Sequence, residues 1–169
     1  MRRVELAHWR LHTVGLTHDL SDAPTDVVGR MLAIQSQDFG PALWSIAQRL
    51  DGVTQRMLMQ AFDDGAFLRT HVLRPTWHFV LPEDLGWLLQ LTAPRVHALN
   101  APYYRRNGLD DDVRACANVA FGKALAGGRS LTRTEIASML ADEGIQADRF
   151  NPRSALLDRV LAPHGEAVM

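Results

Sequence analysis

The first third of the chain carries hydrophobic residues at helical spacing. Apolar positions recur every three or four residues over four stretches, which cover residues 4–15, 24–35, 41–50 and 54–62. Residues that stop or start helices, chiefly glycine and proline, stand between these stretches. The pattern predicts four short helices in succession.

The spacing then changes to a period of two. Residues 67–72 and 76–81 have the composition and alternation of strands, and Leu73-Arg74-Pro75 can turn the chain between them. Several helices followed by one β-hairpin are typical of a winged helix, in which the hairpin forms the wing. We therefore place a winged-helix domain at residues 1–107, with its wing at about residues 67–81.

Helical spacing returns after the hairpin. Pro82-Glu83-Asp84 predicts the start of a helix, Ala93-Pro94 its interruption, and Asn107-Gly108 the end of the first domain. The next helix is predicted to begin at Asp110. Its apolar stripe includes Cys116, so we expect this thiol to be buried and inert.

Two further helices are predicted in the remaining residues. Thr132 and Glu135 have the spacing of a capping box, and Asn151-Pro152 begins another apolar pattern. Two short helices around Gly144 indicate a second helix-turn-helix, and no second hairpin follows it. The predicted fold class is therefore mainly α with a small β-hairpin: a tandem winged helix-turn-helix whose second unit, residues 108–169, is incomplete.

Composition and charge narrow the class of protein. The formal net charge is −1, so any nucleic-acid-binding surface has to be local. The single cysteine excludes an internal disulfide and a cysteine-built zinc site, and His8 and His12 are interpreted as a solvated helix face. The sequence shows no signal-peptide core and no apolar run near the ~20 residues of a membrane span. We expect a soluble cytoplasmic protein without membrane contact.

Gln35 and Gln37 stand where the second predicted helix gives way to a loop. Residues i and i+2 point apart on a helix, but on extended or irregular backbone they can share a face. Each amide offers a donor and an acceptor, so the pair can orient a water molecule or a base edge. The alternative is that both glutamines only satisfy loose backbone groups at the helix end.

Basic and hydrogen-bonding side chains collect on the predicted hairpin. This local basic patch consists of Arg69, His71, Arg74 and His78. It can contact DNA phosphates, or its members can pair with carboxylates across a domain interface. Arg105-Arg106, which follows two tyrosines, suits phosphate contact with stacking and equally suits an interdomain surface.

Several segments together resemble a known family. They are Ala33-Ile34-Gln35-Ser36-Gln37-Asp38, Ala42-Leu43-Trp44, Arg49-Leu50, Leu68-Arg69-Thr70 and Leu73-Arg74-Pro75-Thr76-Trp77-His78-Phe79-Val80, with a weaker match at Leu131-Thr132-Arg133-Thr134-Glu135-Ile136. The pattern is similar to the bacterial winged-helix DNA-binding family that contains the AlkZ/YcaQ-type DNA glycosylases. The resemblance spans about residues 4–145.

The resemblance implies a reaction and a site. Characterised members hydrolyse the N-glycosidic bond of alkylated or crosslinked purines in double-stranded DNA. Their catalytic motif, two glutamines around an aliphatic residue, falls on Gln35 and Gln37. The implied activity is that of a monofunctional DNA glycosylase without cofactor or metal. The DNA-binding residues would be Arg69, His71, Arg74, His78, Arg105 and Arg106.

The sequence departs from the family in two respects. Ser36 stands where the family has an aliphatic residue, and the second wing, the third winged helix and the β-rich part do not follow, as in a C-terminally truncated member. Two alternatives to an enzyme therefore remain. One is a winged-helix regulator that binds DNA without catalysis, and the other is an inactive fragment in which these residues hold the two domains together.

Overall fold

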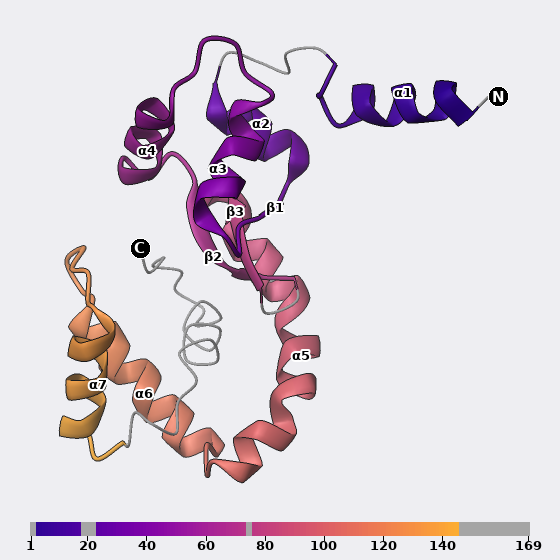
Figure 1. The fold of residues 1–169 in the computed structure, drawn as a ribbon. Helices are drawn as coiled ribbons and strands as arrows, with labels where there is room; N and C mark the ends of the chain where they lie inside the picture. The colour runs from indigo at the N-terminus through magenta and orange to yellow at the C-terminus, as the bar shows by residue number, and fades with distance from the viewer. Residues whose placement is uncertain (1–2, 18–22, 74–75, 146–169) are drawn as a thin grey trace. The chain divides into compact units, whose positions relative to one another are not determined.

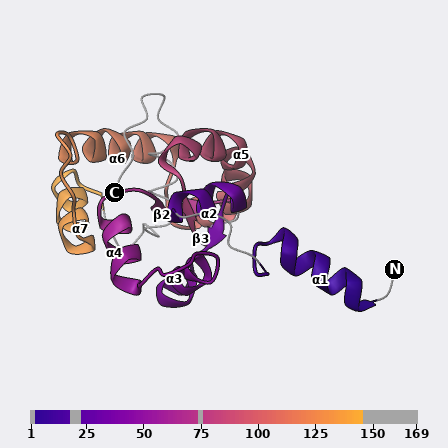
Figure 2. The same ribbon diagram turned by 90° about the horizontal axis from the view of Figure 1, so that it is seen from above.

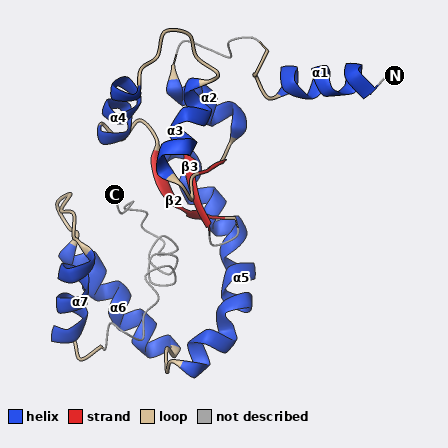
Figure 3. Ribbon diagram, viewed as in Figure 1, coloured by secondary structure: helices blue, strands red, loops and turns tan. Residues whose placement is uncertain are grey.

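The computed structural model describes residues 3–17, 23–73 and 76–145, and its secondary structure is mainly helical with a small sheet (Figures 1 and 3). The helices are α1 (Arg3–Thr13), α2 (Pro24–Met31), α3 (Phe39–Ala47), α4 (Gln55–Asp63), α5 (Pro82–Arg106), α6 (Asp111–Ala124) and α7 (Arg133–Asp142). The strands are β1 (Ile34–Gln35), β2 (Leu68–Val72) and β3 (Thr76–Val80). The predicted mainly α class with a β-hairpin is confirmed. The helix predicted from Asn151-Pro152 and the basic residue Arg74 lie outside the described residues.

The chain divides into two compact units. The first consists of Met1–Thr70 with Thr76–Leu85, and the second of His71–Pro75 with Gly86–Met169. The change from one unit to the other falls near the start of α5, whereas the boundary predicted from the sequence, at Asn107-Gly108, is where α5 ends. No described helix combines the length and the hydropathy needed to cross a membrane.

The sheet has the strand order β1-β3-β2, and its residues belong to the first unit except for His71 and Val72 at the end of β2. β1 pairs antiparallel with β3, with Ile34 opposite Phe79 and Gln35 opposite His78. The prediction that the second helix continues to residue 35 is wrong, because α2 ends at Met31 and Leu32 turns the chain at a φ of 62°. This turn allows Ile34 to reach the sheet, where only 8% of it stays exposed. The glutamine segment therefore leaves the sheet edge, and not a helix end.

The core of the first unit combines residues of α2, α3 and α4 with residues of the sheet. Figures 1 and 2 both show α2 and α3 beside the strands, and α2 contacts α3 and β3. Four rings pack at centroid distances between 5.1 and 6.0 Å, and the cluster consists of Phe39, Phe62, Phe67 and Phe79. Trp44, predicted in the apolar stripe of its helix, is instead 64% exposed. Its exposure follows from its place on the same outer face of α3 as Pro41 and Gln48.

α5 of the second unit runs without a break through Pro94, so the predicted interruption is wrong. Proline removes one backbone hydrogen bond, but Pro94 is exposed and the opposite face buries Leu89, Ala93 and Val96. Burial of one face stabilises a helix beyond its intrinsic propensity, which explains why the helix continues.

The ends of α6 and α7 follow the sequence closely. Asp110 caps α6 by accepting a hydrogen bond from the Val113 N–H at 2.9 Å, and the capping box of Thr132 and Glu135 at α7 is confirmed. Cys116, however, is exposed, so its predicted burial is wrong. The buried stripe of α6 is narrower than predicted and is centred on Ala117, Ala120, Phe121 and Leu125.

Candidate functional site at the glutamine segment

Gln35, Ser36 and Gln37 form an extended segment between α2 and α3. The Ser36 N–H donates to the Trp77 carbonyl of β3 at 2.8 Å, next to the Gln35–His78 pair. Ser36 is fully buried, and the glutamines on either side of it are exposed. Alternate residues of extended backbone share a face. The pattern therefore places both glutamines on the outer side of the segment.

The two glutamine amides are available to other molecules. Within the described parts of the chain, neither side-chain amide has a hydrogen-bond partner. They therefore do not satisfy backbone groups at a helix end there, which was the structural alternative. An exposed amide pair can hold a water molecule or a base edge, and the catalytic role of Gln35 and Gln37 stays a prediction.

Arg69 extends from β2 toward the glutamine segment. In the strand order, β3 lies between β2 and β1, so Arg69 passes over Trp77 with its guanidinium carbon 4.5 Å from the ring centroid. Beyond that ring it donates to the Ser36 carbonyl from Nε at 3.1 Å and from Nη2 at 2.9 Å. Nη2 also donates to the Gln37 carbonyl at 3.2 Å. Burial lowers the pKa of the guanidinium from its ordinary value.

The other predicted residues of the hairpin have different surroundings. His71 is 2% exposed and His78 8% exposed. His78 Nδ1 lies 2.9 Å from the Thr76 carbonyl, and because a carbonyl only accepts, this nitrogen carries a proton in that hydrogen bond. Burial of both rings counts against direct phosphate contact, and their role in DNA binding stays a prediction. Arg69 uses carbonyls as partners, and no carboxylate is seen against it among the described residues.

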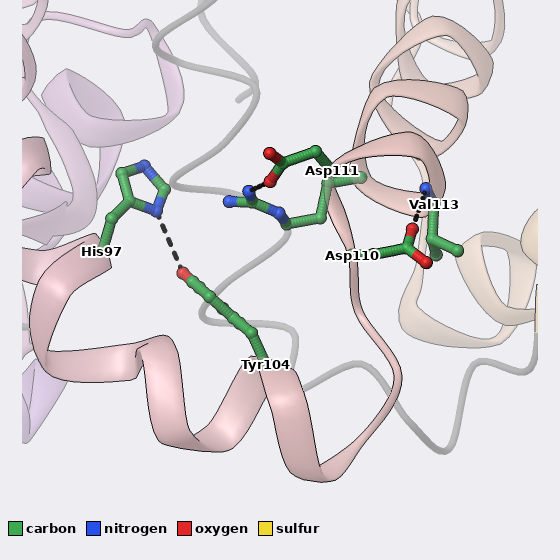
Figure 4. A network of polar contacts seen from close by, with 6 residues as sticks. His97, Tyr104, Asp110, Asp111 and Val113 are labelled. Atoms are coloured by element: carbon green, nitrogen blue, oxygen red, sulfur yellow. Dashed lines mark hydrogen bonds and ion pairs between the residues drawn. The ribbon is translucent and has the colours of Figure 1, made fainter.

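Arg105 and Arg106 lie in the last turn of α5 and are exposed. Nearby, a cavity of about 660 Å³ opens between α5 and α6. Figure 4 shows the polar contacts at its wall, where the Tyr104 hydroxyl meets His97 Nδ1 at 3.1 Å and Arg114 pairs with Asp111. The exposed arginines fit the predicted phosphate contact, which stays a prediction.

Sequence reasoning missed the structural role of Arg49. This residue is 7% exposed; its Nε donates to the Val14 carbonyl at 2.7 Å, and its Nη1 to both oxygens of Ser45. Burial lowers its pKa. The one available signal is an arginine flanked by apolar helical positions, which does not identify its partners. The exposed Trp44, one turn into α3 from the glutamines, was also missed because helical spacing assigned it to the core.

Comparisons with known proteins identify relatives of this chain. The family model described as DNA glycosylase AlkZ-like matches residues 28–166, which include both glutamines and the hairpin. An interstrand DNA cross-link repair glycosylase from Streptomyces sahachiroi is 25% identical over 130 residues, covering 74% of this chain and 35% of that protein.

The fold is similar to a solved structure. The DNA glycosylase AlkZ of Streptomyces sahachiroi matches with a TM-score of 0.72 and 22% sequence identity, over 90% of this chain and 42% of the AlkZ chain. The present chain therefore spans less than half the length of these relatives. Because the family model covers most of its residues, the chain belongs to the AlkZ-like DNA glycosylase family.

Proposed function

We propose that this chain carries the glutamine site of a DNA glycosylase that removes alkylated or crosslinked purines from double-stranded DNA. The observation that supports it best is the exposed amide pair on an extended segment whose backbone is held by β3 and Arg69. Family membership gives this pair its expected role. In that role Gln35 and Gln37 position the water molecule that attacks the sugar.

The chemistry needs no strong base. Alkylation at N7 makes the purine cationic, so it leaves with the electron pair of the glycosidic bond through an oxocarbenium-like state. The water oxygen then bonds to the anomeric carbon, and its proton passes to solvent. A neutral amide is a poor base at pH 7, but fixing the water in place is itself worth several kcal/mol. Two correctly held amides therefore suffice for a substrate that is already activated.

DNA contact requires a local surface because the net charge is −1. Arg105 and Arg106 offer exposed guanidinium groups for phosphate. In the first unit, the exposed Trp44 offers a ring for stacking close in sequence to the glutamines. The curated relative is named for interstrand cross-links, which makes crosslinked or alkylated purines the first substrates to test.

The test is release of free base from DNA that contains N7-methylguanine. We expect the 169-residue chain to release the base, and Gln35→Ala and Gln37→Ala each to abolish release without changing DNA affinity. Gln55→Ala, another exposed glutamine of the first unit at the start of α4, serves as the matched control. Release that persists in a Gln35→Ala/Gln37→Ala double variant would contradict the assignment. Binding to a specific operator without any base release would favour the regulator.

A further inference from the structure

The Arg69 side chain contacts the backbone of the glutamine segment, and not the amides themselves. We infer that Arg69 is a positioning residue, which holds the Ser36 and Gln37 carbonyls so that the two glutamine side chains keep one fixed separation. The catalytic part of this inference rests on the proposed function. The conformational part does not, because the hydrogen bonds to the two carbonyls can be tested without any substrate.

The segment has few other restraints. β1 is two residues long, so the ladder with β3 covers only Ile34 and Gln35. Beyond it, the backbone of Ser36 is held on both sides: its N–H by Trp77, and its carbonyl by two N–H groups of Arg69. The third contact, to the Gln37 carbonyl, fixes the residue before the Asp38 N-cap of α3. On such backbone the two glutamine Cα atoms are about 6.6 Å apart, close enough for both amides to meet one water molecule.

Arg69 is itself immobilised by aromatic rings. Its guanidinium lies over Trp77, and its carbon is 5.6 Å from the centroid of the Phe39 ring. Phe39 belongs to the ring cluster of the core and is the first residue of α3. The planar guanidinium can stack on a ring and donate in its own plane at the same time, whereas a lysine ammonium is a single charged nitrogen that cannot reproduce both contacts together. The core of the first unit thereby sets the position of the site.

This role differs in its consequences from the phosphate contact that the sequence suggests. A phosphate contact contributes to affinity and to its salt dependence, and removing it reduces the salt slope by about 0.9. A positioning contact instead affects the rate at which the bound complex releases the base. A misplacement of about 1 Å can lower that rate on the order of 100-fold.

The experiment compares Arg69→Met, Arg69→Lys and the control Arg56→Met in the full chain. Arg56 is an exposed arginine of α4, so its replacement removes the same charge without touching the segment. Single-turnover base release at saturating N7-methylguanine DNA should fall on the order of 100-fold in Arg69→Met and less in Arg69→Lys. Affinity should stay within about twofold, and its salt slope should not change in any of the three variants.

Hydrogen exchange of the Ser36 amide provides the second readout. This N–H donates to Trp77, and it should exchange at least tenfold faster in Arg69→Met but not in Arg56→Met. If the wild-type chain releases no base, the proposed function fails while this exchange still decides the positioning role. An unchanged exchange rate in Arg69→Met, or a salt slope reduced in Arg69→Met but not in Arg56→Met, would overturn the inference. If Arg69→Met does not fold, Arg69→Lys decides by its exchange rate and its rate of base release, because it keeps the charge and so does not change the salt slope.

Discussion

The hairpin of the first unit and the end of α5 in the second unit contain the same residue types but use them differently. Both combine arginine with aromatic rings, and the sequence suggested DNA contact for both. On the hairpin, the guanidinium of Arg69 lies over Trp77 and is hydrogen-bonded to two carbonyls. At the end of α5, Arg105 and Arg106 are exposed.

The second unit also has a stacked arginine, but it is a different residue. Arg114 of α6 lies 4.9 Å from the Tyr104 ring centroid and pairs with Asp111. In each unit, therefore, the arginine nearest an aromatic ring and an acceptor is used within the fold. The comparison teaches that whether a guanidinium is available to bind DNA depends on the acceptors around it, and not on how basic the surrounding sequence is.

The largest effect is expected from removing the aromatic support of the hairpin. Phe79 is fully buried, with Phe67 at 5.1 Å and Phe39 at 5.6 Å between ring centroids. Phe79→Ala should lower the free energy of unfolding of the first unit by about 3–5 kcal/mol, because the cavity cannot collapse fully. Urea unfolding, with hydrogen exchange of each unit as the probe, measures this loss of stability.

Phe121→Ala is the matched variant in the core of the second unit. It should destabilise its own unit and leave the Ser36 amide protected. If Phe79→Ala costs less than about 1 kcal/mol, the ring cluster does not support the hairpin in the way that burial indicates.

The next largest effect concerns the exposed arginines. If Arg105 and Arg106 contact phosphates, Arg105→Ala/Arg106→Ala should reduce the slope of log K against log salt by about 0.9 for each phosphate that is no longer neutralised. Fluorescence anisotropy with a duplex over a range of salt concentrations measures this slope. Lys123→Ala removes an exposed charge from α6 and should leave the slope as it is. If the double variant keeps the wild-type slope, the phosphate contacts lie elsewhere. Arg105 and Arg106 would then not differ from Arg69 in binding phosphate.

Local signals in the sequence predicted much of this fold. The capping box of Thr132 and Glu135 depends on residues three apart, and the strands of the hairpin alternate visibly, so both were predictable. β1 was not, because a two-residue strand has no periodicity of its own and exists through its pairing with Phe79 and His78. Cys116 was misplaced because spacing predicts the direction of an apolar stripe better than its width.

The same distinction applies to the site. Gln35 and Gln37 could be proposed as site residues from the sequence because their motif lies in one short segment, and their catalytic role stays a prediction. The role of Arg69 depends on the strand order, which carries a side chain of β2 across the middle strand to the Ser36 carbonyl. No pattern of neighbouring residues contains that information. The charge pattern indicated phosphate contact for Arg69, which stays a prediction, but it did not indicate the hydrogen bonds from its guanidinium to the two carbonyls.

A smaller effect is expected from Ser36, which stands where the family has an aliphatic residue. Its hydroxyl is buried and has no hydrogen-bond partner among the described residues. Ser36→Ala removes this unsatisfied group and keeps the carbonyl that Arg69 binds. It should raise the free energy of unfolding by about 1 kcal/mol and leave base release unchanged.

Ser45→Ala is the control for this variant, because the Ser45 hydroxyl accepts from Arg49 and its removal should destabilise the first unit. A thermal unfolding scan distinguishes the two serine variants. Destabilisation by Ser36→Ala would mean that the hydroxyl is satisfied after all. The support of the segment would then include this side chain as well as its backbone.

The smallest effect separates the two units by their response to acid. The backbone hydrogen bond from Thr132, and then its side-chain hydrogen bond, lower the pKa of Glu135. A carboxyl group whose pKa is lower in the folded state stabilises that state at pH values above its unfolded pKa. This contribution is lost as the pH falls through the folded pKa. Protection of the first-turn amides of α7 should therefore fall in acid, and Glu135→Gln should abolish that dependence while Glu143→Gln keeps it. The carbonyls that bind Arg69 do not titrate in this pH range, so protection of the Ser36 amide should not follow the pH dependence of the α7 amides. Identical pH dependences at both sites would mean that the two units lose structure together.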